Sequence, residues 1–196
     1  MRTCELTRKT KETDIRLSLN IDGVGQSSVI TKIGFFDHML EAFAKHSSVD
    51  LMLTCEGDLN VDFHHSVEDT GIVLGQAFAK ALGDKKGIER FGFFVLPMDE
   101  ALVMCSLDFS GRGLLVWDSA YPGEGLVGEF DFELLEEFFR AFAVNAGLTL
   151  NMKLICGNNL HHIAEASFKA LAKSLAMAVK INPDKKDILP STKGVL

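Results

Sequence analysis

An internal repeat constrains this chain more than any other feature of its sequence. Residues 38–51 (HMLEAFAKHSSVDL) align with residues 137–150 (EFFRAFAVNAGLTL), and the alignment pairs two Ala-Phe-Ala triplets. Residues 64–68 (HHSVE) align in the same way with residues 161–165 (HHIAE). The first pair of segments is 99 residues apart and the second pair 97, so the second copy has two residues fewer between its two motifs. We expect a hairpin turn at 157–159 to absorb the difference. The sequence therefore predicts two similar half-domains.

Hydrophobic periodicity supports this division. Residues 14–20, 48–55 and 148–156 alternate between apolar and polar side chains, as half-buried strands do. Helical spacing predicts helices around 36–43, 67–82, 138–142 and 168–175, with Gly83 capping the second of them. The middle, 91–117, is rich in predicted strands, with turns at 97–99 and 110–113. We therefore predict an α+β fold of two duplicated half-domains, residues 1–86 and 87–196, each a small sheet with two helices on one face.

Composition excludes several classes of protein. The formal net charge of -7 argues against binding to nucleic acid or to an anionic membrane, because those surfaces usually attract a basic excess. The four cysteines are far apart and form no CxxC motif, so we expect reduced residues of the core. No apolar run approaches the roughly 20 residues that span a bilayer, and the N-terminus has no apolar signal segment. The sequence thus predicts a cytoplasmic protein.

The two HHxxE motifs are the strongest candidates for chemistry. Residues four positions apart share one face of a helix, so His64 and Glu68 can reach one metal ion, and His161 and Glu165 another. Adjacent helical residues diverge by roughly 100 degrees, so the second histidine of each pair must point elsewhere.

The most economical arrangement therefore has two metal sites. Each site takes a histidine and a glutamate from one motif and the second histidine, His65 or His162, from the other. His38 aligns with Glu137, and each of these residues is expected to supply a further ligand. Imidazole and carboxylate ligands suit Mn, Fe or Zn, and open coordination positions would remain for a substrate.

The histidines also have plainer interpretations. A single HH pair is most often a surface feature or a helix start, but two HHxxE copies in register with a repeat disfavour that reading. His46 is weaker, because its repeat partner is Asn145. Contact with a substrate and pairing with the helix C-terminal dipole are equally good explanations of His46.

The motifs resemble those of one family along essentially the whole chain. They are RKTKET at 8–13, FFDHML at 35–40, HHSVEDTGIVLG at 64–75, HHIAEASFKA at 161–170 and PSTKG at 190–194. Together, in this order, they resemble the imidazoleglycerol-phosphate dehydratase family of histidine biosynthesis. The resemblance implies a fold like that of ribosomal protein S5 domain 2 and a homo-oligomer of 24 subunits whose active sites are shared between subunits.

The resemblance also implies two Mn²⁺ ions per active site. The ligands of one ion would be His38, His65, His161 and Glu165, and those of the other His64, Glu68, Glu137 and His162. Position 137 departs from the family pattern, in which many members carry histidine. A carboxylate is a competent ligand for Mn²⁺, so we expect this site to persist with altered affinity or metal preference.

The implied reaction is the dehydration of D-erythro-1-(imidazol-4-yl)glycerol 3-phosphate to 3-(imidazol-4-yl)-2-oxopropyl phosphate by a hydro-lyase. Coordination of both ring nitrogens would give an imidazolate that expels the hydroxyl group and forms a diazafulvene-like intermediate. Glu12 would remove the carbon-bound proton. The catalytic set implied in this way is Glu12, His64, Glu68, His161 and Glu165.

Substrate binding is implied for the same residues and for several more. The phosphate would lie against basic and hydroxyl side chains, of which Arg112 stands between two glycines that permit close approach. The segment 191–193 is expected to become ordered when phosphate binds. The full substrate-binding set is Glu12, His38, His46, His64, His65, Glu68, Arg90, Arg112, His161, Lys169, Ser191, Thr192 and Lys193.

Two other functions compete with a lyase. A metal-dependent hydrolase would use the same ligands to activate a water molecule. A non-catalytic metal-binding assembly protein would have saturated coordination and no turnover. Competition by free imidazole separates the lyase from the hydrolase, because only the lyase needs an imidazole at the open metal positions.

Overall fold

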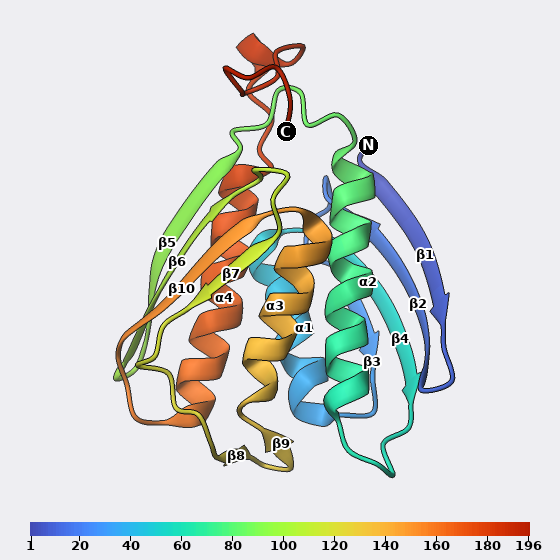
Figure 1. Ribbon diagram of the computed structural model, residues 1–196, viewed down its shortest axis with the longest axis vertical. Coiled ribbons are helices and arrows are strands. Elements are labelled where there is room, and N and C mark those ends of the chain that lie inside the picture. Colours follow the sequence, from blue (N-terminus) through green and yellow to red (C-terminus); the bar gives the residue numbers. More distant parts are fainter.

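The computed structural model describes residues 1–196 and consists of two four-stranded sheets on either side of a layer of four helices (Figure 1). The first half contains β1 (Thr3–Lys9), β2 (Thr13–Asn20), β3 (Ser27–Ile30), α1 (Gly34–Ser47), β4 (Asp50–Gly57) and α2 (His64–Leu82). The second half contains β5 (Phe91–Met98), β6 (Ala101–Asp108), β7 (Leu114–Trp117), β8 (Leu126–Val127), β9 (Phe130–Asp131), α3 (Leu134–Ala146), β10 (Thr149–Cys156), α4 (Leu160–Ala178) and the 3-10 turn η1 (Pro183–Lys185).

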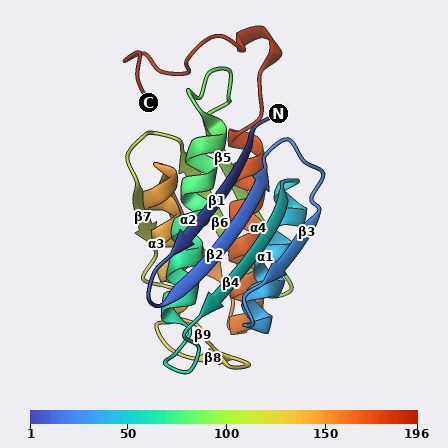
Figure 2. The ribbon, with the colours of Figure 1, turned by 90° about the vertical axis from the view of Figure 1, so that its right-hand side faces the viewer.

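The two sheets have the same topology. The first has the order β1-β2-β4-β3, visible in Figure 2, and the second has the order β5-β6-β10-β7. In both sheets the first three strands pair antiparallel, and the last strand of the order joins parallel to its neighbour. The predicted α+β duplication is confirmed. The exact boundary at 86/87 stays a prediction.

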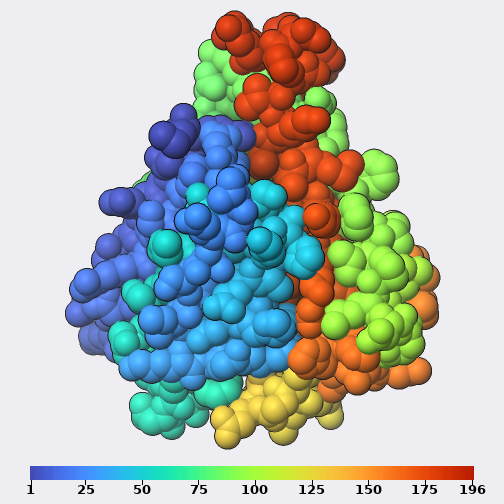
Figure 3. Space-filling view, turned by 180° about the vertical axis from the view of Figure 1, so that it is seen from behind, coloured from blue at the N-terminus to red at the C-terminus, as the bar shows by residue number.

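The core lies between the sheets, because each strand buries alternate side chains against the helices. In β2, for example, Ile15, Leu17 and Leu19 are buried while the residues between them are not. The halves meet through their helices, with α2 packed against α3 and α1 against α4. Figure 3 shows the second contact from behind, where the blue surface of the first half meets the orange-red surface of α4. Each helix pair therefore combines one helix from each half.

Two glycines allow α2 and α3 to approach closely. A Cβ atom on Gly71 would lie 2.8 Å from the carbonyl oxygen of Phe138, and one on Gly75 would lie 2.6 Å from that of Phe142. Any side chain at these positions would collide with the backbone of α3. The close contact therefore packs α2 directly against the helix that carries Glu137.

Two local predictions were wrong. The turn between β5 and β6 contains only Asp99 and Glu100, so Pro97 and Met98 belong to the strand. The segment 157–159 is a connection from β10 to α4 and not a hairpin turn, because the chain leaves the sheet there to start a helix. The corresponding connection of the first half runs from β4 to α2 and holds the two additional residues. Gly83 ends α2 as predicted, with a positive φ of 57°.

The chain ends lie on one side of the molecule (Figure 1). There the segment after α4 pairs with the connection between the halves, through an isolated bridge between Ile88 and Ile181. All four cysteines are unpaired, and Cys55 and Cys105 are buried as expected, whereas Cys4 is only half-buried and Cys156 is exposed. None of the helices combines the length and the apolar character that crossing a membrane requires.

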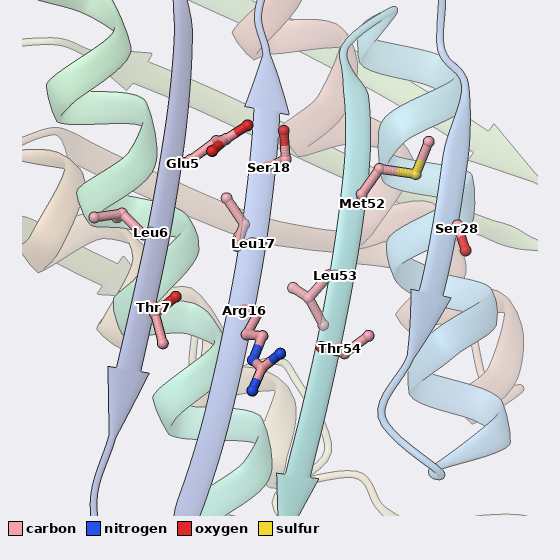
Figure 4. Close-up of a pocket in the computed structure, with 10 residues that line it drawn as sticks. All are labelled: Glu5, Leu6, Thr7, Arg16, Leu17, Ser18, Ser28, Met52, Leu53 and Thr54. Atoms are coloured by element: carbon pink, nitrogen blue, oxygen red, sulfur yellow. The ribbon is translucent and has the colours of Figure 1, made fainter.

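A groove of about 530 Å³ lies on the outer face of the first sheet (Figure 4). It contains no histidine and none of the predicted site residues, so its size does not make it the reactive site. Its lining residues are Glu5, Leu6, Thr7, Arg16, Leu17, Ser18, Ser28, Met52, Leu53 and Thr54.

Candidate functional site

The two HH pairs occupy the first turns of α2 and α4, and each turn is fixed by a preceding polar residue. Asp62 accepts a hydrogen bond from the backbone N–H of His64 at 2.8 Å. Asn159 accepts from the backbone N–H groups of His161 and His162 at 2.9 and 3.2 Å. These bonds satisfy N–H groups that a helix start leaves free. Both pairs are therefore held at rigid helix starts.

One trio of ligand atoms is already assembled within the chain. The side chains of His38, His161 and Glu165 offer one ligand atom each, and these atoms all lie within 4.8 Å of one another. Glu165 Oε2 is 3.2 Å from Nε2 of His161 and 3.7 Å from Nε2 of His38. The contact between α1 and α4 produces this trio, so it combines residues of both halves. Two imidazoles and a carboxylate are a donor set that suits Mn, Fe or Zn.

The carboxylate of this trio is buried and charged. Burial raises the pKa of Glu165, but hydrogen bonds from Lys169 and His161 and the nearby His38 outweigh it, and the net pKa is lowered. Lys169 Nζ lies 2.5 Å from the other oxygen, Oε1. The carboxylate is therefore ionised at neutral pH and Oε2 remains available to a cation.

His46 lies two turns after His38 on α1 and is half-buried. Burial lowers its pKa, and the charges of Lys169 and Lys173 on α4 lower it further. The ring is therefore neutral near pH 7, and it lies near Lys169 and Lys173 of α4. Its predicted contact with substrate stays a prediction.

The HHxxE motif of the first half gives a looser arrangement. His64 Nε2 lies 3.9 Å from Glu68 Oε2, and both side chains are more than two-fifths exposed. Glu137 lies in the first turns of α3, the helix that packs against α2. These three residues are the repeat counterparts of His161, Glu165 and His38, but they do not form a trio within 4.8 Å.

The second histidine of each pair points away from its neighbour, as helix geometry predicts. Nδ1 of His65 contacts Asp58 Oδ2 at 3.0 Å, and Nε2 of the same ring lies 3.8 Å from Glu12 Oε1. The Asp58 hydrogen bond raises the pKa of His65. Glu12 lies in the turn between β1 and β2, next to this imidazole.

The second half repeats this arrangement with other residues. Nδ1 of His162 contacts Glu100 Oε2 at 2.7 Å, and Nε2 lies 3.5 Å from Asp99 Oδ2. The Glu100 hydrogen bond raises the pKa of His162. Within one chain the structure therefore does not bring His65 or His162 into a ligand set with the opposite motif.

Sequence reasoning missed five polar residues around the histidine pairs. Two of them, Asp62 and Asn159, stand at matching positions of the repeat, because each precedes its HH pair by two residues. That spacing is a helix-cap signal and could have been recognised. No sequence pattern marks the others, which are Asp58, Asp99 and Glu100.

The predicted phosphate-binding residues gather near the C-terminal segment. Arg90 donates to both oxygens of Asp108 at 2.6 and 3.0 Å and to the carbonyl oxygen of Pro190 at 2.8 Å. Three of its N–H groups are thus engaged, and about two remain for another anion. A Cβ on Gly111 would lie 2.6 Å from the backbone of Leu196, which places the end of the chain beside the Arg112 loop.

The predicted residues of the tail lie in the same segment. Ser191 Oγ donates to the carbonyl oxygen of Val195 and accepts from the backbone N–H of Lys193. The fold therefore brings 190–196 beside Arg90 and the loop around Gly111.

Comparisons with known proteins agree on one family. The family model described as imidazoleglycerol-phosphate dehydratase matches residues 31–175. Proteins of that name from Caldanaerobacter subterraneus subsp. tengcongensis and Cereibacter sphaeroides are 58% and 55% identical over 196 residues, covering 100% of each chain.

Solved structures give the same result. The imidazoleglycerol-phosphate dehydratase of Staphylococcus aureus matches with a TM-score of 0.83 and 39% identity, over 92% of this chain and 99% of that one. The enzyme of Pyrococcus furiosus in complex with (S)-C348 matches with a TM-score of 0.83 and 36% identity, over 97% and 100% of the two chains. The chain belongs to the imidazoleglycerol-phosphate dehydratase family, a family of hydro-lyases.

Proposed function

We propose that this protein removes water from imidazoleglycerol phosphate in histidine biosynthesis and releases the corresponding ketone, imidazoleacetol phosphate. The observation that carries the proposal is the trio of His38, His161 and Glu165, which stands in a member of the imidazoleglycerol-phosphate dehydratase family. A metal ion held by these three residues would keep coordination positions for a nitrogen of the substrate's imidazole ring, and the carboxylate is ionised at neutral pH.

The donor set fits the proposed pair of Mn²⁺ ions. His38, His161 and Glu165 would hold one ion together with His65, and His64, Glu68, Glu137 and His162 would hold the other. Because neither set is complete within one chain, the proposal includes sites shared between subunits of a homo-oligomer of 24 chains. When bound, the two ions supply the positive charge that stabilises a deprotonated imidazole ring, whose electrons can expel the adjacent hydroxyl group.

Glu12 is the proposed general base. Its carboxylate lies 3.8 Å from Nε2 of His65, so it would face the ring of a substrate bound beside that histidine. There it would take the proton from the carbon adjacent to the one that loses its hydroxyl group, which leaves an enol that converts to the ketone. His46 and Lys169 would contact the same substrate from α1 and α4.

The phosphate end of the substrate is assigned to Arg90, Arg112 and the tail residues Ser191, Thr192 and Lys193. Guanidinium groups bind phosphate oxygens through paired hydrogen bonds and so orient the substrate as well as attract it. Binding at Arg90 would use its two free N–H groups or exchange its bond to Pro190, and in the second case the tail would be released from Arg90.

The test is turnover of imidazoleglycerol phosphate by metal-stripped protein, with and without added Mn²⁺, followed through the enolisable ketone. We expect product only with Mn²⁺. We also expect Glu12→Gln to lower turnover by about 100-fold to 10,000-fold, the usual contribution of a general base, with bound Mn²⁺ unchanged. Absence of product from protein that holds Mn²⁺ would reject the proposal and favour a hydrolase or a binding protein. Unchanged turnover in Glu12→Gln would reject only the assignment of the base.

A further inference from the structure

We infer that Asp58 and Glu100 are positioning residues for the second histidine of each pair: each carboxylate holds Nδ1 of its imidazole and thereby makes Nε2 the metal-binding nitrogen. Neither residue belongs to the ligand or substrate sets proposed above. The inference rests on the proposed function, because the metal ions come from that proposal.

The contact in the first half joins three elements. His65 Nδ1 lies 3.0 and 3.2 Å from the two oxygens of Asp58, whose side chain is only 24% exposed. The backbone N–H of Asp58 donates to the carbonyl oxygen of Glu12 at 3.1 Å. Asp58 therefore fixes the imidazole on α2 relative to the turn that carries the proposed base.

The contact in the second half is shorter and more strongly fixed. Glu100 Oε2 lies 2.7 Å from Nδ1 of His162, and its other oxygen accepts from the backbone N–H of Asn159 at 2.8 Å and of Asn158 at 3.3 Å. Both oxygens of Glu100 thus face N–H donors, and the backbone bonds hold the carboxylate in place beside His162.

Hydrogen-bond chemistry decides which nitrogen is left for the metal. An ionised carboxylate has no proton and can only accept, so the nitrogen that faces it must carry one. In a neutral imidazole the other nitrogen then has a free lone pair. For both His65 and His162 the nitrogen facing the carboxylate is Nδ1, which leaves Nε2 as the only possible ligand atom.

The two halves reach this contact from unrelated positions. Asp58 follows β4, and the residue that follows the equivalent strand β10 is Gly157, which has no side chain. Glu100 instead comes from the turn between β5 and β6. A contact inherited only through the repeat would use matching positions in the two halves. The carboxylate contact to Nδ1 comes instead from positions that do not match, which indicates that the histidine requires it.

The experiment measures Mn²⁺ binding directly, by equilibrium dialysis of the assembled protein with the bound metal counted by atomic absorption. The variants are Asp58→Ala, Asp58→Asn, Glu100→Ala, Glu100→Gln and the double alanine variant. Glu56→Gln is the matched control, because Glu56 is an exposed carboxylate two residues from Asp58 that pairs with Lys32 and touches no histidine. Far-UV circular dichroism and the size of the assembly show whether each variant folds.

We expect wild type and Glu56→Gln to bind two Mn²⁺ ions per chain with equal affinity. Each single alanine variant should bind one of the two ions about 10- to 100-fold more weakly, the usual effect of losing a partner of a ligating histidine, and the double variant should weaken both. Asn and Gln retain an oxygen acceptor and should recover part of the affinity, which a purely structural defect would not.

Other results would overturn the inference. Unchanged affinity in both alanine variants would reject it while leaving the proposed function intact, since wild type would still bind two ions. Equal losses in the Ala and the Asn or Gln variants would show that the hydrogen bond to Nδ1 is not the cause. A wild-type protein that binds no Mn²⁺ would instead reject the proposed metal chemistry, and the inference with it.

Discussion

The close contact between α2 and α3 gives a prediction whose size follows from the structure. In Gly75→Ala the new Cβ would lie 2.6 Å from the carbonyl oxygen of Phe142, 2.9 Å from the backbone nitrogen of Ala146 and 2.9 Å from Cβ of Asn145. Two of these atoms belong to the backbone of α3 and cannot rotate away. The helices must separate by about 0.8 Å to restore the 3.4 Å of an ordinary contact.

Overpacking of this kind costs about 1–3 kcal/mol, and rigid partners place this position at the upper end. Alanine recovers about 1 kcal/mol through its higher helix propensity. The net loss is therefore about 2 kcal/mol, which lowers Tm by about 4–8 °C in a chain of this length. Scanning calorimetry at one protein concentration measures the shift.

Gly34→Ala is the control, because Gly34 also lies in a helix but a Cβ there meets no atom within 4 Å. We expect its Tm to equal or exceed that of wild type. A Gly75→Ala protein that melts at the wild-type temperature would refute the close approach of α2 and α3.

Three further outcomes are expected. Glu137→Ala should lose one of two bound Mn²⁺ ions while Glu137→His keeps both, measured as metal content after dialysis; equal loss in both would argue against Glu137 as a ligand. Backbone N–H groups of the 24–26 loop lower the pKa of Asp50, so the stabilisation it gives is present above its ordinary value of 3.8 and is lost as pH falls through the lowered value. The Tm difference between wild type and Asp50→Ala should therefore shrink between pH 7 and pH 3, and a constant difference would contradict this. Burial raises the pKa of the Cys105 thiol to about 12, so a thiol reagent should label exposed Cys156 in the folded protein and Cys105 only after unfolding in urea.

Much of the fold was predictable because the repeat is carried by apolar periodicity. Equivalent strands bury equivalent faces, so two copies of one pattern give two sheets of the same order. The pairing of α2 with α3 and of α1 with α4 was not predictable. The alignment only states that the halves resemble each other and is equally compatible with helices that pack within each half.

The candidate site divides in the same way. The faces of His64, His161 and their glutamates follow from helical spacing alone. The partners of His65 and His162 depend on where a loop and a turn come to lie after folding. No sequence pattern distinguishes Asp58 and Glu100 from the other acidic residues, and only the tertiary structure shows that they contact the histidines.

The crossed packing of the helices also bears on the history of this chain. The trio combines His38 from the first half with His161 and Glu165 from the second, so neither half alone could have bound a metal ion in this way. An ancestral half-length polypeptide carrying all three residue types would have formed the trio only as a pair of identical chains related by a twofold axis. Gene duplication and fusion would then have made that ancient dimer permanent, after which each copy could diverge, as positions 38 and 137 have done.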